Sequence, residues 1–151
     1  MILLDGKNTS EIVLNKVKEH IKTLNITPYL VVILVGDNPA SKIYVKNKQI
    51  AAEKVGIKST VLHFGADITE YDLLNEIDKL NKDKDITGIL VQLPLPEHIN
   101  KNKVIMAISP QKDVDGFHPI NCGKIMLGIE PYFYPATPQG ILMLIDNYGI
   151  E

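Results

Sequence analysis

The chain has 151 residues, of which 45% are hydrophobic and 23% charged, as is typical of a globular domain with one sizeable core. The formal net charge is −2 and all 16 basic residues are lysines, so no nucleic-acid partner and no anionic membrane surface is expected. The single cysteine, Cys122, excludes an internal disulfide, and no Cys/His spacing is typical of a zinc site. The N-terminal apolar run ends at Asp5, too early for a signal peptide, so we expect a cytoplasmic protein.

Hydrophobic spacing predicts helices that alternate with short, unbroken apolar strands. The expected elements are a helix capped within 8–10 and ending near 24, a strand over 29–35, a helix over about 40–55, a strand over 59–64, a helix after Thr69 that carries Leu73, Leu74, Ile77 and Leu80, a strand over 88–93, a short helix over about 101–108 and a helix from about 138 to the chain end. Strands without polar alternation are typical of a sheet covered on both faces. The order therefore predicts an α/β fold, a doubly wound three-layer α/β/α sandwich with a mainly parallel sheet. The stretch 109–138 is expected to be irregular, a length typical of functional or linking loops.

Lys48 is the first candidate for chemistry. Helical spacing places it on one face with Tyr44, Ala51, Ala52 and Val55, where an apolar side chain is expected. One interpretation is a catalytic lysine, with the hydroxyl of Tyr44 one turn away within its reach. The other is a lysine that extends its charged end from the edge of an apolar face into water. Spacing alone does not decide between them.

Gln92 interrupts the apolar run of the third expected strand, close to its carboxyl end. A buried amide without partners costs roughly 1–3 kcal/mol, so Gln92 is expected to be hydrogen-bonded. Ligands of open α/β sheets bind beyond the carboxyl ends of the strands, and the helix that carries Lys48 begins at the equivalent end of the first strand. The two side chains are therefore expected to meet there, unless Gln92 satisfies a neighbouring loop backbone.

The segment 112–119 contains two carboxylates, Asp113 and Asp115, in an Asp-x-Asp-Gly pattern. A calcium loop is not expected, because the third ligand and the distant glutamate are missing. One of the two acids is a candidate acceptor for a ligand's amino and ring N–H groups. The alternative is a turn in which the Asp side chains bond the local backbone.

Several segments carry a joint resemblance to a known family. In order, they are Leu4-Asp5-Gly6-Lys7, Pro39-Ala40-Ser41-x-x-Tyr44-Val45-x-x-Lys48, Gly88-Ile89-Leu90-Val91-Gln92-Leu93-Pro94-Leu95-Pro96, Lys112-Asp113-Val114-Asp115-Gly116-Phe117 and Pro135-Ala136-Thr137-Pro138-x-Gly140. Together they resemble the bifunctional methylenetetrahydrofolate dehydrogenase/methenyltetrahydrofolate cyclohydrolase family over essentially the whole chain. The resemblance implies a fold like the N-terminal domain of amino-acid dehydrogenases.

The resemblance also implies roles for the candidate residues. Lys48 is expected to be the catalytic lysine, with Tyr44 stacking near the pterin and Gln92 tuning the protonation of Lys48. Asp115 is expected to hold the pterin amino and ring nitrogens, and to count with these three as a catalytic residue. The residues expected to bind substrate are Tyr44, Lys48, Gln92, Leu93, Asp115 and Ser41.

The implied activity is NADP-dependent oxidation of 5,10-methylenetetrahydrofolate to the methenyl form, followed by hydrolysis to 10-formyltetrahydrofolate. It would serve one-carbon metabolism and purine biosynthesis, without a metal and in a homodimeric full-length enzyme. Both steps involve a cationic one-carbon centre, beside which an ammonium group is repulsive. A lysine held neutral by burial is therefore the expected base.

Two departures from the family qualify these expectations. Ala136 stands where many relatives have the Cys of Pro-Cys-Thr-Pro, so no thiol role is expected there. Relatives continue into a Rossmann domain with a Gly-Arg-Ser turn, whereas no Gly-x-Gly-x-x-Gly pattern occurs in this chain. We therefore expect a folate-binding catalytic domain over 1–120 and an inter-domain segment with a linking helix over 121–151, with NADP bound by a domain absent from this chain. Alone, the chain is expected to lack dehydrogenase activity, to bind ligand weakly, and to associate through an apolar face near 138–150.

Two alternatives remain open at this stage. One is a relative that has only one of the two activities. The other is a non-catalytic folate-binding or interaction module that has kept the fold. The presence of all four polar candidates, Tyr44, Lys48, Gln92 and Asp115, argues against a retired site.

Overall fold

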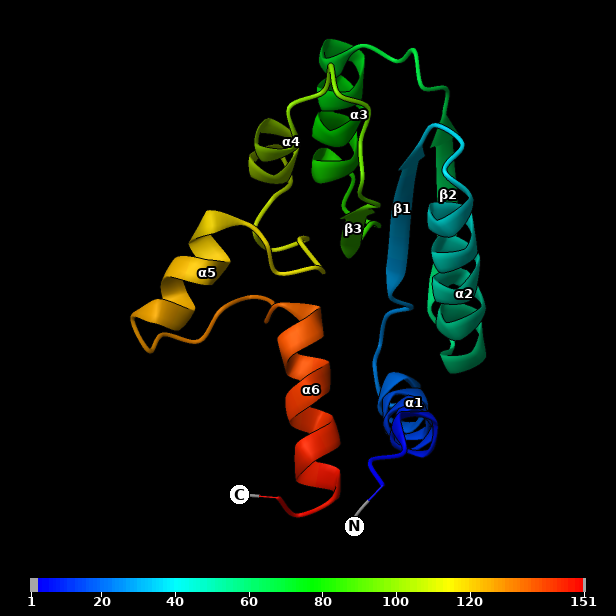
Figure 1. The fold of residues 1–151 in the computed structure, drawn as a ribbon, viewed down its shortest axis with the longest axis vertical. Coiled ribbons are helices and arrows are strands. Elements are labelled where there is room, and N and C mark those ends of the chain that lie inside the picture. Colours follow the sequence, from blue (N-terminus) through cyan, green and yellow to red (C-terminus); the bar gives the residue numbers. More distant parts are fainter. Residues whose placement is uncertain (1–2, 151) are drawn as a thin grey trace.

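A parallel sheet forms the centre of the computed structural model, which describes residues 3–150 (Figure 1). Within these residues the strands are β1 (Tyr29–Val35), β2 (Lys58–Phe64) and β3 (Gly88–Val91), in the order β2-β1-β3. Because β1 pairs with a strand on each side, its side chains from Val31 onward are all buried. The predicted strand without polar alternation is confirmed. Strand β3 ends earlier than expected, at Val91, although the amide of Gln92 still donates to Ile33 O at 2.9 Å.

Helices cover both faces of the sheet, which confirms the predicted three-layer α/β/α sandwich. On one face α2 (Pro39–Val55) packs Val45 against Val32, Leu34 and Leu90. On the other face lie α3 (Glu70–Lys82) and α4 (Lys101–Ala107). The buried residues of this second cluster from the two helices are Leu73, Ile77, Leu80 and Val104, packed against Val31, Ile33, Ile89 and Val91.

The connections make β1 the strand at which the winding reverses. Helix α2 joins β1 to β2 across one face, and α3 joins β2 to β3 across the other. In open α/β sheets such a reversal leaves a crevice at the carboxyl ends of the two neighbouring strands, here β1 and β3. The fold therefore places the ends of these strands, and the N-terminal part of α2, around one candidate site.

Helix α1 (Gly6–Lys22) and helix α6 (Ala136–Asn147) lie side by side, away from the sheet (Figure 1). The amide of Asp5 donates to Tyr148 Oη at 2.9 Å, and Asn147 Nδ2 donates to Thr9 Oγ1 at 3.1 Å. The expected cap of α1 within residues 8–10 is wrong. The Asp5 carboxylate instead accepts hydrogen bonds from the first free amides of the helix, so α1 begins earlier.

The stretch 109–138 contains a helix that the sequence analysis did not predict. Helix α5 (Pro119–Met126) is short, begins with Pro and includes Gly123. His118, the residue before it, caps the helix: its Nδ1 accepts a hydrogen bond from the amide of Ile120 at 3.1 Å. Helix α6 also begins at Ala136 rather than near 138. The proposed division of the chain at residue 120 stays a prediction, and α5 runs across it.

Exposed apolar side chains gather on α6, at the end of α5 and on the segment that follows it. They are Ile125, Met126, Leu127, Ile129, Ile141, Leu142 and Met143. The structure thus presents the apolar face expected near 138–150. No helix within residues 3–150 combines the length and the hydrophobicity needed to cross a membrane.

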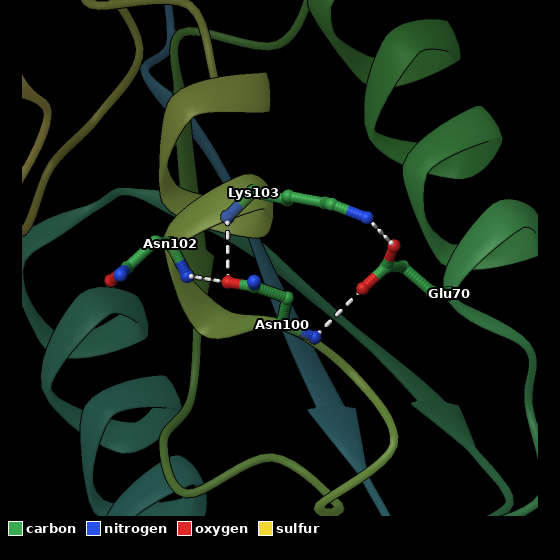
Figure 2. A network of polar contacts seen from close by, with 4 residues as sticks. All are labelled: Glu70, Asn100, Asn102 and Lys103. Atoms are coloured by element: carbon green, nitrogen blue, oxygen red, sulfur yellow. Dashed lines mark hydrogen bonds and ion pairs between the residues drawn. The ribbon is translucent and has the colours of Figure 1, made fainter.

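A polar network joins the beginnings of α3 and α4 and closes the loop that follows β3 (Figure 2). The carboxylate of Glu70 accepts from the amide of Asn100 at 2.8 Å and from Lys103 Nζ at 2.6 Å. The Asn100 side chain caps α4 by accepting from the amides of Asn102 and Lys103. The loop 92–100 is therefore anchored at its far end, opposite the candidate site.

Candidate functional site

Lys48 and Gln92 meet beyond the carboxyl end of β3, as the sequence predicts. Lys48 Nζ donates to Gln92 Oε1 at 3.0 Å, and both side chains are half-buried. Gln92 Nε2 donates to Leu93 O at 2.7 Å, so the side-chain amide is bonded at both ends. This fixes the side chain of Gln92 and, through it, the direction of the Lys48 amine.

The buried face of α2 contains Ala52 and Val55, as expected, but Val45 in place of Tyr44. Val45 is buried, whereas Tyr44 is 59% exposed, and the described hydrogen bonds include none between Tyr44 and Lys48. The approach of the Tyr44 hydroxyl to the amine therefore stays a prediction. Tyr44 lies one turn before Lys48 at the rim of the site, free to contact a ligand. Ser41 is buried at the start of the helix, with Oγ 3.5 Å from Leu93 O.

The segment that carries Asp115 runs beside β3. The amide of Ile89 donates to Lys112 O at 2.7 Å, and Asp113 pairs with Ile89 as an isolated parallel bridge. Lys112 Nζ binds the carbonyl oxygens of Leu80, Asn81 and Asp83, at 3.0, 2.9 and 2.6 Å, where α3 ends. A cation at a helix C-terminus satisfies its free carbonyl groups. The segment is thus held by a strand on one side and a helix end on the other.

Asp115 is a partly desolvated carboxyl group in the electrostatic field of Lys48. Burial raises the pKa of Asp115 above its ordinary value, the charge of Lys48 lowers it in part, and the charge of Asp113 raises it further. Asp115 also lines a small pocket together with Leu93 and Phe117. A carboxylate in such a place is available to a ligand that brings its own N–H donors.

Asp113, in contrast, is already occupied. It is 2% exposed, and its Oδ2 accepts from the amide of His118 at 2.8 Å and from Asn121 Nδ2 at 3.1 Å. Of the two acids between which the sequence did not decide, Asp113 has the local backbone and side-chain partners. Asp115 is the one left to face a ligand.

Gly116 follows Asp115 in a left-handed conformation, with φ of +69°. A Cβ at this position would lie 2.6 Å from Tyr134 C and from Pro135 N, so only glycine fits. The amide of Ala136 donates to Asp115 O at 3.3 Å. The Pro135-Ala136 motif therefore packs directly on the turn that carries Asp115, a role that needs no thiol at residue 136.

The described residues 3–150 hold no cluster of three or more His, Cys, Asp or Glu side chains arranged for a metal ion. The candidate site brings together Lys48 and Gln92, with Asp115 in the field of Lys48, Ser41 bonded to Leu93 nearby and Tyr44 exposed one turn before Lys48. This defines the class of protein: a doubly wound α/β domain with an amine and a carboxylate at its switch point. Such a pair can bind an N–H-rich ring and exchange a proton with it.

The family model for the tetrahydrofolate dehydrogenase/cyclohydrolase catalytic domain matches residues 4–115. The chain therefore belongs to the tetrahydrofolate dehydrogenase/cyclohydrolase family, as its motifs predict. It is 49% identical to the bifunctional protein FolD of Aquifex aeolicus, with 99% of this chain and 53% of that protein covered.

Solved structures agree with this assignment. The bifunctional FolD methylenetetrahydrofolate dehydrogenase/cyclohydrolase of Campylobacter jejuni superimposes with a TM-score of 0.95 at 50% identity, over 99% of this chain and 54% of that one. A Trypanosoma brucei methylenetetrahydrofolate dehydrogenase-cyclohydrolase, complexed with NADP cofactor and inhibitor, gives 0.93 at 28% identity, over 99% and 52%. The chain thus spans about half the length of the relatives it matches.

Proposed function

We propose that this chain is the folate-binding catalytic half of a bifunctional enzyme of one-carbon metabolism. The whole enzyme oxidises 5,10-methylenetetrahydrofolate with NADP and hydrolyses the product to 10-formyltetrahydrofolate. The observation that carries the proposal is the Lys48–Gln92 hydrogen bond of 3.0 Å in the field of Asp115, at the carboxyl ends of β1 and β3. Membership of the family over residues 4–115 supports the choice of substrate.

Asp115 binds the pterin in this proposal. A carboxylate accepts two hydrogen bonds at once, and the amino group and ring N–H of a pterin present two donors side by side. Burial strengthens such charge-assisted bonds, because less water competes for the carboxylate. Tyr44, exposed at the rim, covers the ring, and Ser41 and Leu93 form the floor.

Lys48 moves the proton in the hydrolytic step. Water adds to the methenyl carbon and gives up a proton, which Lys48 accepts as general base while the C–O bond forms. The bond between that carbon and N5 then breaks with its electron pair going to N5, which takes up a proton. The added hydroxyl loses its own proton and becomes the carbonyl of the formyl group on N10, so one proton is released overall. Gln92 orients the amine by accepting a hydrogen bond from it, and Gln92 is itself held by the hydrogen bond that its Nε2 donates to Leu93 O.

The start of α2 does not fit the diphosphate of NADP. At the start of α2, where helix amides would attract a phosphate, Pro39 has no N–H and the Asn38 side chain already accepts from the amide of Ser41. We therefore place the cofactor on a second domain and assign no step through it to this chain. A homodimeric full-length enzyme in the cytoplasm, with a domain boundary near residue 120, completes the proposal.

The test is kinetic, in the longest natural chain that carries this sequence. Lys48→Met and Gln92→Ala are compared with the parent for both reactions. Loss of a positioned general base is expected to reduce hydrolysis by about 10²-fold or more. A parent with one activity would indicate a monofunctional relative. A parent that binds folate without turnover would indicate a binding module, and unchanged hydrolysis in Lys48→Met would contradict the assigned role.

A further inference from the structure

A buried side-chain amide ties together the segments around Asp115. Asn121 of α5 is fully buried, and its Nδ2 donates to Pro110 O at 3.0 Å and to Asp113 Oδ2 at 3.1 Å. Its Oδ1 accepts from the amide of Tyr132 at 3.2 Å. A single side chain therefore bonds the segment before Asp115, a carboxylate two residues from it, and the segment that returns towards it.

We infer that Asp113 and Asn121 form a positioning pair for Asp115: Asn121 holds the turn in place, and Asp113 sets the charge beside the carboxylate. This inference rests on the proposed function, in which Asp115 binds the pterin. Neither residue of the pair touches the ligand in this account, so both act through Asp115.

The burial of the pair supports a positioning role. A buried polar group that loses its partner destabilises the fold, so Asp113 and Asn121 hold each other in one arrangement. Asp113 is also bonded to the amide of His118, which leads into α5, and Tyr132 leads towards the Gly116 contact at Tyr134 and Pro135. The turn with Asp115 is thus fixed on both sides by bonds that begin at the pair.

Asp113 also contributes to the electrostatic environment of the Asp115 carboxyl group. The charged groups that act on its carboxyl are Lys48, from α2, and Asp113, from its own segment. Lys48 favours the carboxylate and Asp113 disfavours it. Replacing Asp113 by Asn keeps an oxygen that accepts from His118 and Asn121 but removes the charge, so position and charge can be separated.

The first experiment compares Asn121→Ala with Asn81→Ala in the 151-residue chain, by calorimetric titration with a stable folate analogue. Asn81 is the matched control, because its side-chain amide also bonds the chain ahead of Asp115. Its Nδ2 donates to Ala107 O at 2.7 Å and its Oδ1 accepts from the amide of Ser109 at 2.8 Å, and neither atom bonds Asp113. Asn121→Ala is expected to raise the Kd about tenfold or more, and Asn81→Ala to leave it within about twofold. Equal affinities in all three proteins, or an equal loss in both variants, would overturn the inference.

The second experiment does not depend on folate binding or on the folding of Asn121→Ala. Carboxyl carbon NMR follows the titration of Asp115 in the parent and in Asp113→Asn. The pKa of Asp115 is expected to fall in the variant, because a like charge has been removed. An unchanged titration would overturn the role of Asp113. A parent that fails to bind the analogue would instead count against the proposed function, while this titration still decides the inference.

Discussion

The amine of Lys48 is held by the side chain of Gln92, 44 residues away, through a hydrogen bond of 3.0 Å. The bond joins α2, which follows β1, to the loop that follows β3. It therefore spans the crevice that the reversal of the winding opens between two parallel strands. The charge of Lys48 also acts on the carboxyl of Asp115, so an amine and a carboxyl group lie close together there.

The bond between Lys48 and Gln92 predicts energetic coupling. A double-mutant cycle of Lys48→Met and Gln92→Met, measured by urea unfolding, is expected to give a coupling energy of about 1 kcal/mol, since both side chains are half-buried. The same cycle with Lys48→Met and Gln49→Met serves as the control, and its two effects should add. Additive effects for Lys48 and Gln92 would contradict the bond.

The raised pKa of Asp115 predicts how stability depends on pH. From its ordinary value of 3.8 up to its raised pKa, the folded state binds more protons at this carboxyl than the unfolded state. The contribution of Asp115 to the free energy of unfolding therefore falls as the pH rises through this window. Asp115→Asn is expected to gain stability relative to the parent as the pH rises from below 3.8 to neutrality, in urea titrations at each pH. A difference that does not depend on pH would contradict the shift.

Gly116 is expected to tolerate no side chain. Gly116→Ala adds a Cβ within 2.7 Å of Tyr134 and Pro135 at a φ of +69°. Gly128→Ala is the matched control, because Gly128 has a φ of +68° with nothing within 4 Å. The free energy of unfolding should fall by about 1–2 kcal/mol in the control, from backbone strain alone, and by about 1–3 kcal/mol more in Gly116→Ala, from overpacking. Similar unfolding free energies for the two variants would show that the turn is not packed as described.

Lys112 is expected to stabilise the fold through three carbonyl groups rather than through a surface ion pair. Lys112→Met removes these hydrogen bonds at the end of α3 and should cost about 1.5–3 kcal/mol. Lys82→Met removes an exposed pair with Asp78 and should change the unfolding free energy much less. High salt should weaken the effect of Lys82 alone. Equal losses of unfolding free energy in the two variants would contradict a stabilising role for the three hydrogen bonds of Lys112.

Much of the sheet and its helices could be predicted, because local patterns carry the information. Strand β1 is apolar throughout because it pairs with a strand on each edge and helices cover both faces of the sheet. Helix α5 could not be predicted in the same way. Its turns contain Pro119 and Gly123, and its place depends on Asn121, whose partners lie up to 11 residues away in irregular backbone.

The candidate site could be predicted only in part, for the same reason. Gln92 and Lys48 stand out as polar residues in apolar patterns, so their pairing was accessible to sequence reasoning. Val45 and Tyr44 are adjacent on the helix, and only packing against Val32 and Leu34 decides which one is buried. The different roles of Asp113 and Asp115 depend on partners five and eight residues further along the chain, which the Asp-x-Asp-Gly spacing does not reveal.

The central claim is that the pterin pocket lies in this chain and is built on Asp115. A calorimetric titration of the 151-residue chain with a stable folate analogue, run beside Asp115→Ala, tests it most directly. The account predicts measurable binding by the parent and a loss of about 10²-fold or more in the variant, because two charge-assisted hydrogen bonds are removed. Binding that is equal in both proteins, or no binding by the parent, would contradict it.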